Sequence, residues 1–230
     1  DLRRFCLLCF YTLASAFVAA ADAPTSATCR DERPQKLAVV LGVGPGLGAA
    51  IAARFAAEGN DFHVAMVARR KEALEGYAKD IAGSTSVHPA DLSVPTDVTR
   101  VLGEIKAAHG PCSLLVYNAG VMAEYKSMEI TEAEFNTAMN LHVTSALIAS
   151  QAVFPDMKEA GSGAMLFTGG GLALFPEYGQ KWPALTAGKA ALRGLVIAMA
   201  GEVKEHGIRV GTVTVCGEVK PDTPFAPDLI

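Results

Sequence analysis

The chain alternates short, nearly continuous apolar runs with longer segments of helical periodicity. The runs predicted as strands are residues 37–41, 62–67, 86–89, 113–117, 164–168 and 209–215. The segments predicted as helices are residues 47–58, 70–81, 95–108, 132–158 and 183–206. Strands that are apolar on both faces are typical of a parallel sheet covered by helices on both sides. The pattern therefore predicts an α/β fold with a doubly wound parallel sheet.

The length of the chain limits the number of domains. With 230 residues, half of them apolar, it is long enough for one α/β domain with a well-buried core. It is too short to add a separate substrate domain of ordinary size. We therefore expect one domain over residues 37–230.

The first 21 residues do not fit this domain. Residues 5–21 form a continuous apolar stretch preceded by Arg3 and Arg4. Such a segment is typical of a cleavable signal for the secretory pathway or an organelle, and also long enough for a retained membrane anchor. Both interpretations stay open. Residues 22–36, rich in proline, serine, threonine and charge, are predicted to be a linker.

Charge and cysteine content narrow the classes of partner. The net charge of −4 is spread along the chain without a basic run, which argues against nucleic acid. Five cysteines without paired spacing beyond Cys6 and Cys9 do not form a disulfide framework, and we expect Cys112 and Cys216 to be buried and inert. The five histidines occur singly, so no metal site is predicted.

A glycine-rich turn, LGVGPGLG, follows the first predicted strand at residues 41–48. Gly42, Gly46 and Gly48 give the spacing GxxxGxG, whereas Leu47 stands where GxGxxG requires glycine. Glycines let the backbone approach a pyrophosphate, and the amides at a helix N-terminus bind the anion. The turn therefore predicts a nucleotide site, with a purely structural turn as the alternative.

The residues after the second predicted strand indicate which dinucleotide is bound. NAD-binding proteins commonly place an acid here for the ribose hydroxyls, but this chain has Ala68 followed by Arg69 and Arg70. A guanidinium can bind a ribose 2′-phosphate, which a carboxylate would repel. NADP is therefore preferred over NAD. The alternative is that the two arginines are solvated residues at a helix start.

Further short motifs occur in a fixed order: Asp91 and Leu92 after the third strand, YNAG at residues 117–120, and MNL at residues 139–141. With the glycine turn, these residues resemble the short-chain dehydrogenase/reductase family over about residues 37–224. The resemblance implies one NAD(P)-binding Rossmann domain. It places the cofactor against Gly42, Gly46, Leu47, Gly48, Arg69, Arg70, Asp91, Leu92, Asn118, Ala119, Gly120, Lys189 and Val219.

The same resemblance implies a catalytic group of asparagine, serine, tyrosine and lysine. Asn140 and Lys189 match two of its members, but Leu185 occupies the tyrosine position of YxxxK. The serine position falls at Gly169 in this reading. Thr168 and Tyr178 are the hydroxyl-bearing residues that we consider as replacements.

The end of the sequence departs from the family as well. Cys216 and Gly217 resemble its PG segment, with Val219 near the carboxamide, and the sequence ends at Ile230. We expect the substrate-covering C-terminal part to be shortened. The long helices at residues 132–158 and 183–206 resemble those that pair in family oligomers.

Two functions follow from these observations. The first is an NADP-dependent oxidoreductase that acts on an unidentified carbonyl or alcohol. The second is a catalytically inactive nucleotide-binding pseudoenzyme that serves as a structural subunit of a membrane-associated complex.

Overall fold

A computed structural model describes residues 35–230, which form one compact unit. The predicted signal or anchor over residues 1–21 and most of the predicted linker lie outside the described residues. The prediction for the linker's end was wrong by one residue, because Lys36 is already the first residue of strand β1.

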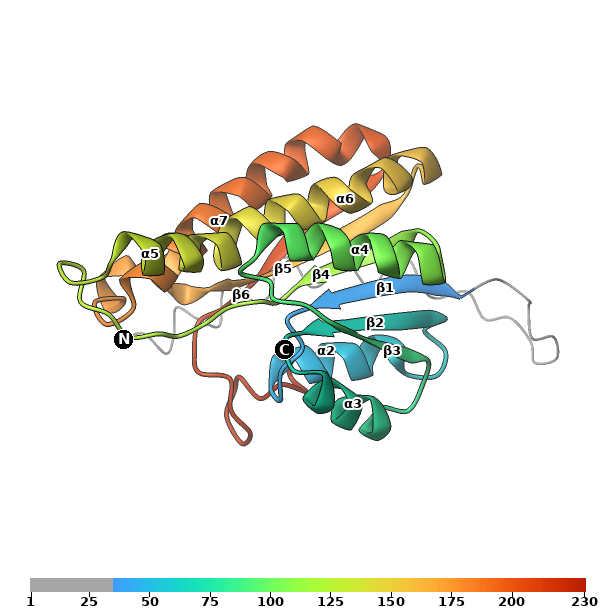
Figure 1. Cartoon of the computed structure of the whole chain (residues 1–230), viewed down its shortest axis with the longest axis horizontal. Coiled ribbons are helices and arrows are strands. Elements are labelled where there is room, and N and C mark those ends of the chain that lie inside the picture. Colours follow the sequence, from blue (N-terminus) through green and yellow to red (C-terminus); the bar gives the residue numbers. More distant parts are fainter. Residues whose placement is uncertain (1–34) are drawn as a thin grey trace. The chain divides into compact units, whose positions relative to one another are not determined.

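Six parallel strands form the central sheet in the order β3-β2-β1-β4-β5-β6 (Figure 1). The strands are β1 (Lys36–Leu41), β2 (Phe62–Ala68), β3 (Thr85–Pro89), β4 (Cys112–Tyr117), β5 (Gly163–Gly170) and β6 (Ile208–Val215). The order reverses between β1 and β4, which is the arrangement of a doubly wound sheet. The predicted fold class is confirmed.

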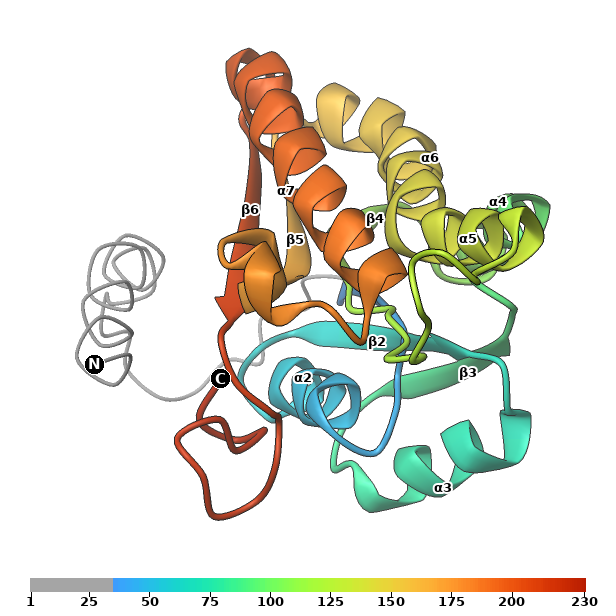
Figure 2. The ribbon, with the colours of Figure 1, turned by 90° about the vertical axis from the view of Figure 1, so that its left-hand side faces the viewer.

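Helices cover both faces of the sheet (Figure 2). One face packs against α2 (Leu47–Ala56) and α3 (Lys71–Asp80). The other packs against α4 (Pro95–His109), α6 (Ser145–Ala160) and α7 (Pro183–Val203). Each face of the sheet has its own hydrophobic core, because successive side chains along a strand point to opposite faces.

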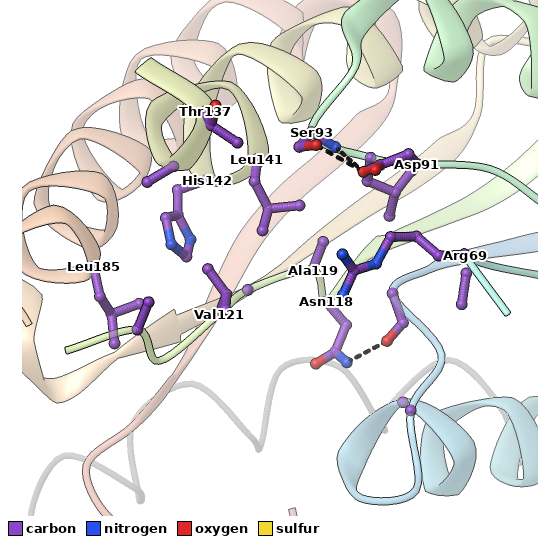
Figure 3. Close-up of a pocket in the computed structure, with 18 of the residues that line it drawn as sticks. Arg69, Asp91, Ser93, Asn118, Ala119, Val121, Thr137, Leu141, His142 and Leu185 are labelled. Atoms are coloured by element: carbon purple, nitrogen blue, oxygen red, sulfur yellow. Dashed lines mark hydrogen bonds between the residues drawn. The ribbon is translucent and has the colours of Figure 1, made fainter. Parts of the chain in front are cut away.

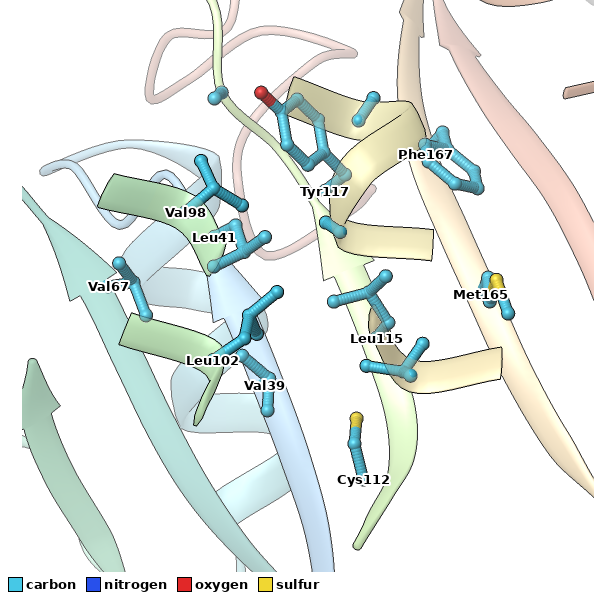
Figure 4. Close-up of a cluster of buried hydrophobic side chains, with 14 of the residues drawn as sticks. Val39, Leu41, Val67, Val98, Leu102, Cys112, Leu115, Tyr117, Met165 and Phe167 are labelled. Carbon is cyan, nitrogen blue, oxygen red and sulfur yellow. The ribbon is translucent and has the colours of Figure 1, made fainter. Parts of the chain in front are cut away.

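Three residues of β1 illustrate this division. Val39 and Leu41 lie in the core under α4, α6 and α7 (Figure 4), whereas Val40 lies in the core under α2 and α3. Cys112, at the start of β4, is buried, and burial raises the pKa of its thiol to about 12. Cys216, by contrast, is only half-buried, which corrects its predicted burial, because it lies just beyond the end of β6.

The predicted helix over residues 132–158 has three parts. Helix α5 (Glu132–Met139) continues into a π-helical turn, η2 (Asn140–Thr144), and then into α6. The prediction missed the turn because a π turn inserts one residue while the chain stays helical.

The predicted helix at residues 183–206 consists of α7 and the 3₁₀ turn η5 (Lys204–His206). It is long and apolar enough to cross a membrane, and it is the sole such helix found over residues 35–230. It packs on β5, β6 and η2, and Leu192 and Val196 lie in the core. Core packing thus accounts for its apolar composition.

Candidate functional site

A pocket of about 700 Å³ lies at the carboxyl ends of β1, β2, β3 and β4 (Figure 3). Ligands of doubly wound sheets bind at this edge, where the strand order reverses. Eleven of the predicted site residues line it: Gly42, Gly46, Leu47, Gly48, Arg69, Arg70, Asp91, Leu92, Asn118, Ala119 and Gly120. The fold therefore brings together residues that are far apart in the sequence.

The glycine turn is held against the end of β4. Gly42 has φ of 95°, and a Cβ at this position would lie 2.6 Å from the Ala119 backbone nitrogen. A Cβ on Gly48 would lie 2.5 Å from the Gly42 carbonyl oxygen. The Asn118 side chain donates a hydrogen bond of 2.9 Å to that same oxygen. Glycine is thus required at positions 42 and 48 for the turn to close.

Helix α2 begins inside this turn. Its N-cap, Gly46, offers no side chain to the first amides of the helix. Those amides and the helix dipole are suited to a phosphate group. Val219 does not line the pocket, but its Cγ1 lies 3.8 Å from the position of a Cβ on Gly46.

Two exposed arginines border the pocket on the β2 side. Arg69 and Arg70 follow β2, and the Arg69 guanidinium points toward the pocket in Figure 3. Across from them, the Asp91 carboxylate accepts hydrogen bonds from the Ser93 amide and hydroxyl at 2.9 and 2.7 Å. Asp91 therefore shapes its own turn, and the two guanidinium groups remain available to an anion.

Lys189 lies just outside the pocket lining and is buried. Its Nζ donates a hydrogen bond of 2.6 Å to the Thr168 carbonyl oxygen. Burial lowers the pKa of this ammonium group to about 8. The Thr168 hydroxyl in turn donates to Asn118 Oδ1 at 2.7 Å. One hydrogen-bonded chain thus links Lys189 to the glycine turn.

The family model for short chain dehydrogenase matches residues 36–227. The chain belongs to this family. It is 27% identical over 184 residues to 2-dehydro-3-deoxy-D-gluconate 5-dehydrogenase of Dickeya dadantii, covering 77% of this chain and 70% of that protein. It is 28% identical over 192 residues to human dehydrogenase/reductase SDR family member 4, covering 82% and 68%.

Solved structures of short-chain dehydrogenases share the fold. A metagenomic short-chain oxidoreductase in complex with NADP superimposes with a TM-score of 0.76 at 29% identity, covering 82% of this chain and 86% of that one. L-sorbose reductase from Gluconobacter frateurii, complexed with NADPH and L-sorbose, gives 0.70 at 29% identity, covering 78% and 68%.

Leu185 and Gly169, the two positions that the resemblance matched to hydroxyl-bearing residues, carry no hydroxyl. Leu185 lines the pocket and cannot transfer a proton. Position 169, which we matched to the serine, faces away, since its Cβ would lie 2.7 Å from Thr212 Oγ1 on β6. Position 170 faces Lys189, with its Cβ 3.5 Å from Lys189 Cγ. Of the two positions, Gly170 is therefore the one that faces Lys189.

The predicted substitutes for these hydroxyls do not line the pocket. Tyr178 lies on the 3₁₀ turn η4 (Pro176–Tyr178) and is 56% exposed. Thr168 already uses its hydroxyl on Asn118. Asn140 begins the π turn, and its carbonyl oxygen accepts from the Ser145 amide. Thr168, Tyr178 and Asn140 are thus not among the residues that line the pocket.

The sequence did not single out several polar residues that line the pocket: Tyr77, Ser93, Tyr125, Glu134, Thr137 and His142. His142 stands on the π turn between Leu141 and Val143. Its position in an otherwise apolar segment is the signal that could have singled it out. Within the described part of the chain, no cluster of three potential metal ligands occurs.

Proposed function

We propose that this protein is an NADP-dependent oxidoreductase that transfers a hydride between the cofactor and a carbonyl or alcohol. The observation that carries the proposal is the pocket at the strand ends, where a glycine cradle and two guanidinium groups meet. Relatives with the same fold have been solved with NADP and NADPH.

The residues around the pocket fit the parts of NADP. A Cβ at Gly42 or Gly48 would fill the space next to the turn, so both glycines leave the backbone open to a pyrophosphate. Arg69 and Arg70 suit the ribose 2′-phosphate, because guanidinium groups bind phosphate with paired hydrogen bonds. Ala68 brings no negative charge that would repel it.

The chemistry of the bound cofactor is hydride transfer. Lys189 keeps a cationic amine beside the β5 end, with its position fixed by the bond to Thr168. The apolar residues Leu141, Ala184 and Leu185 line part of the pocket and limit the access of water to it.

Cofactor binding is tested by fluorescence titration with NADPH and NADH. We expect Arg69→Ala and Arg70→Ala to weaken NADPH binding at least 10-fold each, about 1.4 kcal/mol, and to leave NADH binding within two-fold. Arg54→Ala, which changes an exposed arginine in the last turn of α2, is the control. Equal loss for both nucleotides would contradict the assignment of the 2′-phosphate site.

A second candidate is a nucleotide-binding protein without turnover. The observation in its favour is the absence of a side-chain hydroxyl at both Leu185 and Gly170, the positions that face the pocket and Lys189. Steady-state assays with saturating NADPH over a panel of ketones and aldehydes separate the two. Tight binding with no turnover of any member would support this candidate.

A further inference from the structure

His142 is the buried polar residue of the pocket that the proposed function leaves without a role. It lies on the π turn η2, is 1% exposed and lines the pocket. Neither ring nitrogen makes a hydrogen bond of ordinary length and angle with residues 35–230. Figure 3 shows the ring pointing from the helix toward Val121, with Leu185 beyond it.

An unpaired buried imidazole is energetically unfavourable. Leaving a buried donor or acceptor unsatisfied costs about 1–3 kcal/mol, and most buried polar groups in proteins are hydrogen-bonded. Since neither ring nitrogen makes a hydrogen bond of ordinary geometry within the described residues and the ring lines the pocket, a bound ligand is placed to pair with it. A ligand with a hydrogen-bonding atom at this point would satisfy the ring.

Two glycines make room for the ring and leave it next to Lys189. A Cβ on Gly188 would lie 2.6 Å from His142 Cβ. A Cβ on Gly120 would lie 3.6 Å from His142 Cε1 and 3.8 Å from Lys189 Nζ. The imidazole and the ammonium group therefore approach the same point, the end of β4, from two different helical elements.

The environment determines the charge of the ring. Burial, and then the positive charge of Lys189, lower the pKa of His142 to about 4, while a hydrogen-bonding contact with the Val121 backbone has a smaller, opposite effect. The imidazole is therefore neutral at pH 7 and offers one N–H donor and one acceptor. A neutral N–H can bind a carbonyl oxygen and the charge that develops on it.

We propose that His142 is a catalytic residue whose imidazole N–H donates a hydrogen bond to the reacting oxygen of an apolar ketone or aldehyde. This inference depends on the proposed oxidoreductase function. The substrate class follows from the apolar residues that line the pocket together with His142: Val121, Ala138, Leu141, Ala184 and Leu185.

In the direction of reduction, the carbonyl group takes up a hydride at carbon and a proton at oxygen. The carbonyl carbon gains a hydride from the reduced cofactor, which is oxidised, and the π bond of the carbonyl breaks. Its electron pair moves to the oxygen, where the N–H of His142 stabilises the charge. The oxygen then takes a proton from water, and hydroxide is left. Val121, at the pocket, is 43% exposed, so water has access to this side.

The test compares His142→Phe, His142→Gln and the control His206→Phe, which alters a histidine beside Phe154 at the far end of α7. Reduction of cyclohexanone and benzaldehyde is measured at saturating NADPH. We expect His142→Phe to lower kcat about 100-fold, since one oxyanion donor contributes 10²–10³. His142→Gln should recover about 10-fold, and NADPH binding should stay within two-fold in all variants.

The outcomes separate this inference from the proposed function. If His142→Phe keeps kcat within two-fold, the role of His142 is overturned and the oxidoreductase stands. If wild type does not bind NADPH, or binds it and reduces neither compound nor any other carbonyl of the panel, both fail.

A measurement on wild type covers the case that the variants do not fold. With ¹⁵N-labelled histidine and saturating NADP⁺, addition of isobutyramide, a carbonyl compound that accepts no hydride, should shift the ring signals of His142. The His206 signals should stay unchanged. Unmoved His142 signals at saturating amide would overturn the inference.

Discussion

At the scale of single residues, burial decides the charges at the site. Lys189 and His142 are both buried near Gly120, and burial lowers the pKa of each. The ammonium group has the Thr168 carbonyl as acceptor, whereas the imidazole makes no hydrogen bond of ordinary geometry within residues 35–230. The site therefore holds a lysine with pKa about 8 beside a neutral imidazole.

Protonation of His142 should destabilise the fold. Its folded pKa of about 4 lies below the ordinary 6.5, so the unfolded chain binds the proton more tightly and stability falls as pH decreases from 6.5 to 4. The loss amounts to about 3 kcal/mol at most. Urea unfolding at pH 7.0 and 4.5 should show a smaller pH effect in His142→Gln than in wild type.

His63 and His88 also have lowered pKa values and act with the same sign. The difference between wild type and His142→Gln isolates the contribution of His142. An identical pH effect in the two proteins would show that the ring is not buried in solution.

Two glycines of the same turn should respond differently to alanine. Gly42→Ala places a Cβ at positive φ and 2.6 Å from the Ala119 nitrogen, so we expect a loss of roughly 2–3 kcal/mol. Gly44→Ala meets no atom within 4 Å and should be neutral or stabilising by up to about 1 kcal/mol. Denaturant unfolding checks both, and a similar loss at the two positions would contradict the geometry.

The sequence indicated most residues of the cofactor end of the site but fewer of the catalytic end. The glycine turn and the arginines were predictable because their positions follow strand ends. Position 170 could not be distinguished from 169, since a shift of one residue along a strand reverses the face. His142 was missed because its role depends on the π turn and on Gly188, which only the folded chain brings together.

At the scale of elements, the break between α5 and α6 is the main feature that periodicity could not show. Hydrophobic spacing over residues 132–158 fits one continuous helix, since a single inserted residue shifts the apolar face only slightly. The start of α5 at Glu132 agrees with the predicted start of the helix. Its N-cap, Thr131, forms a capping box with Glu134.

Removal of this cap should weaken α5. Thr131→Ala deletes the acceptor for the Glu134 amide, and we expect a loss of about 1 kcal/mol in the free energy of unfolding. Thr137→Ala is the matched control, because the Thr137 hydroxyl only bonds back to the Ala133 carbonyl within the helix. If the two losses were equal, the capping box would have no specific effect.

At the scale of the whole molecule, the alternation of strands and helices was enough to predict a doubly wound parallel sheet. Few sheet topologies are compatible with that alternation. The pocket is built from both halves of the sheet, since the turn after β1 and the segment after β4 line it together. A ligand bound there contacts both halves and should stabilise the folded protein as a unit.

Global stabilisation by NADP⁺ should be measurable. A ligand that binds only the folded state at 100 times its Kd adds about 2.7 kcal/mol to the free energy of unfolding. We expect the urea midpoint to rise by the corresponding amount for wild type, and by less for Arg69→Ala at the same NADP⁺ concentration. An unchanged wild-type midpoint at millimolar NADP⁺ would contradict binding to the folded chain.

The geometry around Gly170 makes the site a template for protein engineering. The three atoms nearest to a Cβ there are methylene carbons of Lys189, at 3.5 to 3.8 Å, so Gly170→Ser fits without displacing the backbone. Leu185→Tyr extends a phenol into open pocket. The double variant installs two hydroxyls beside an amine already tuned to pKa about 8, and its carbonyl reductase rate would measure how much catalysis this scaffold still supports.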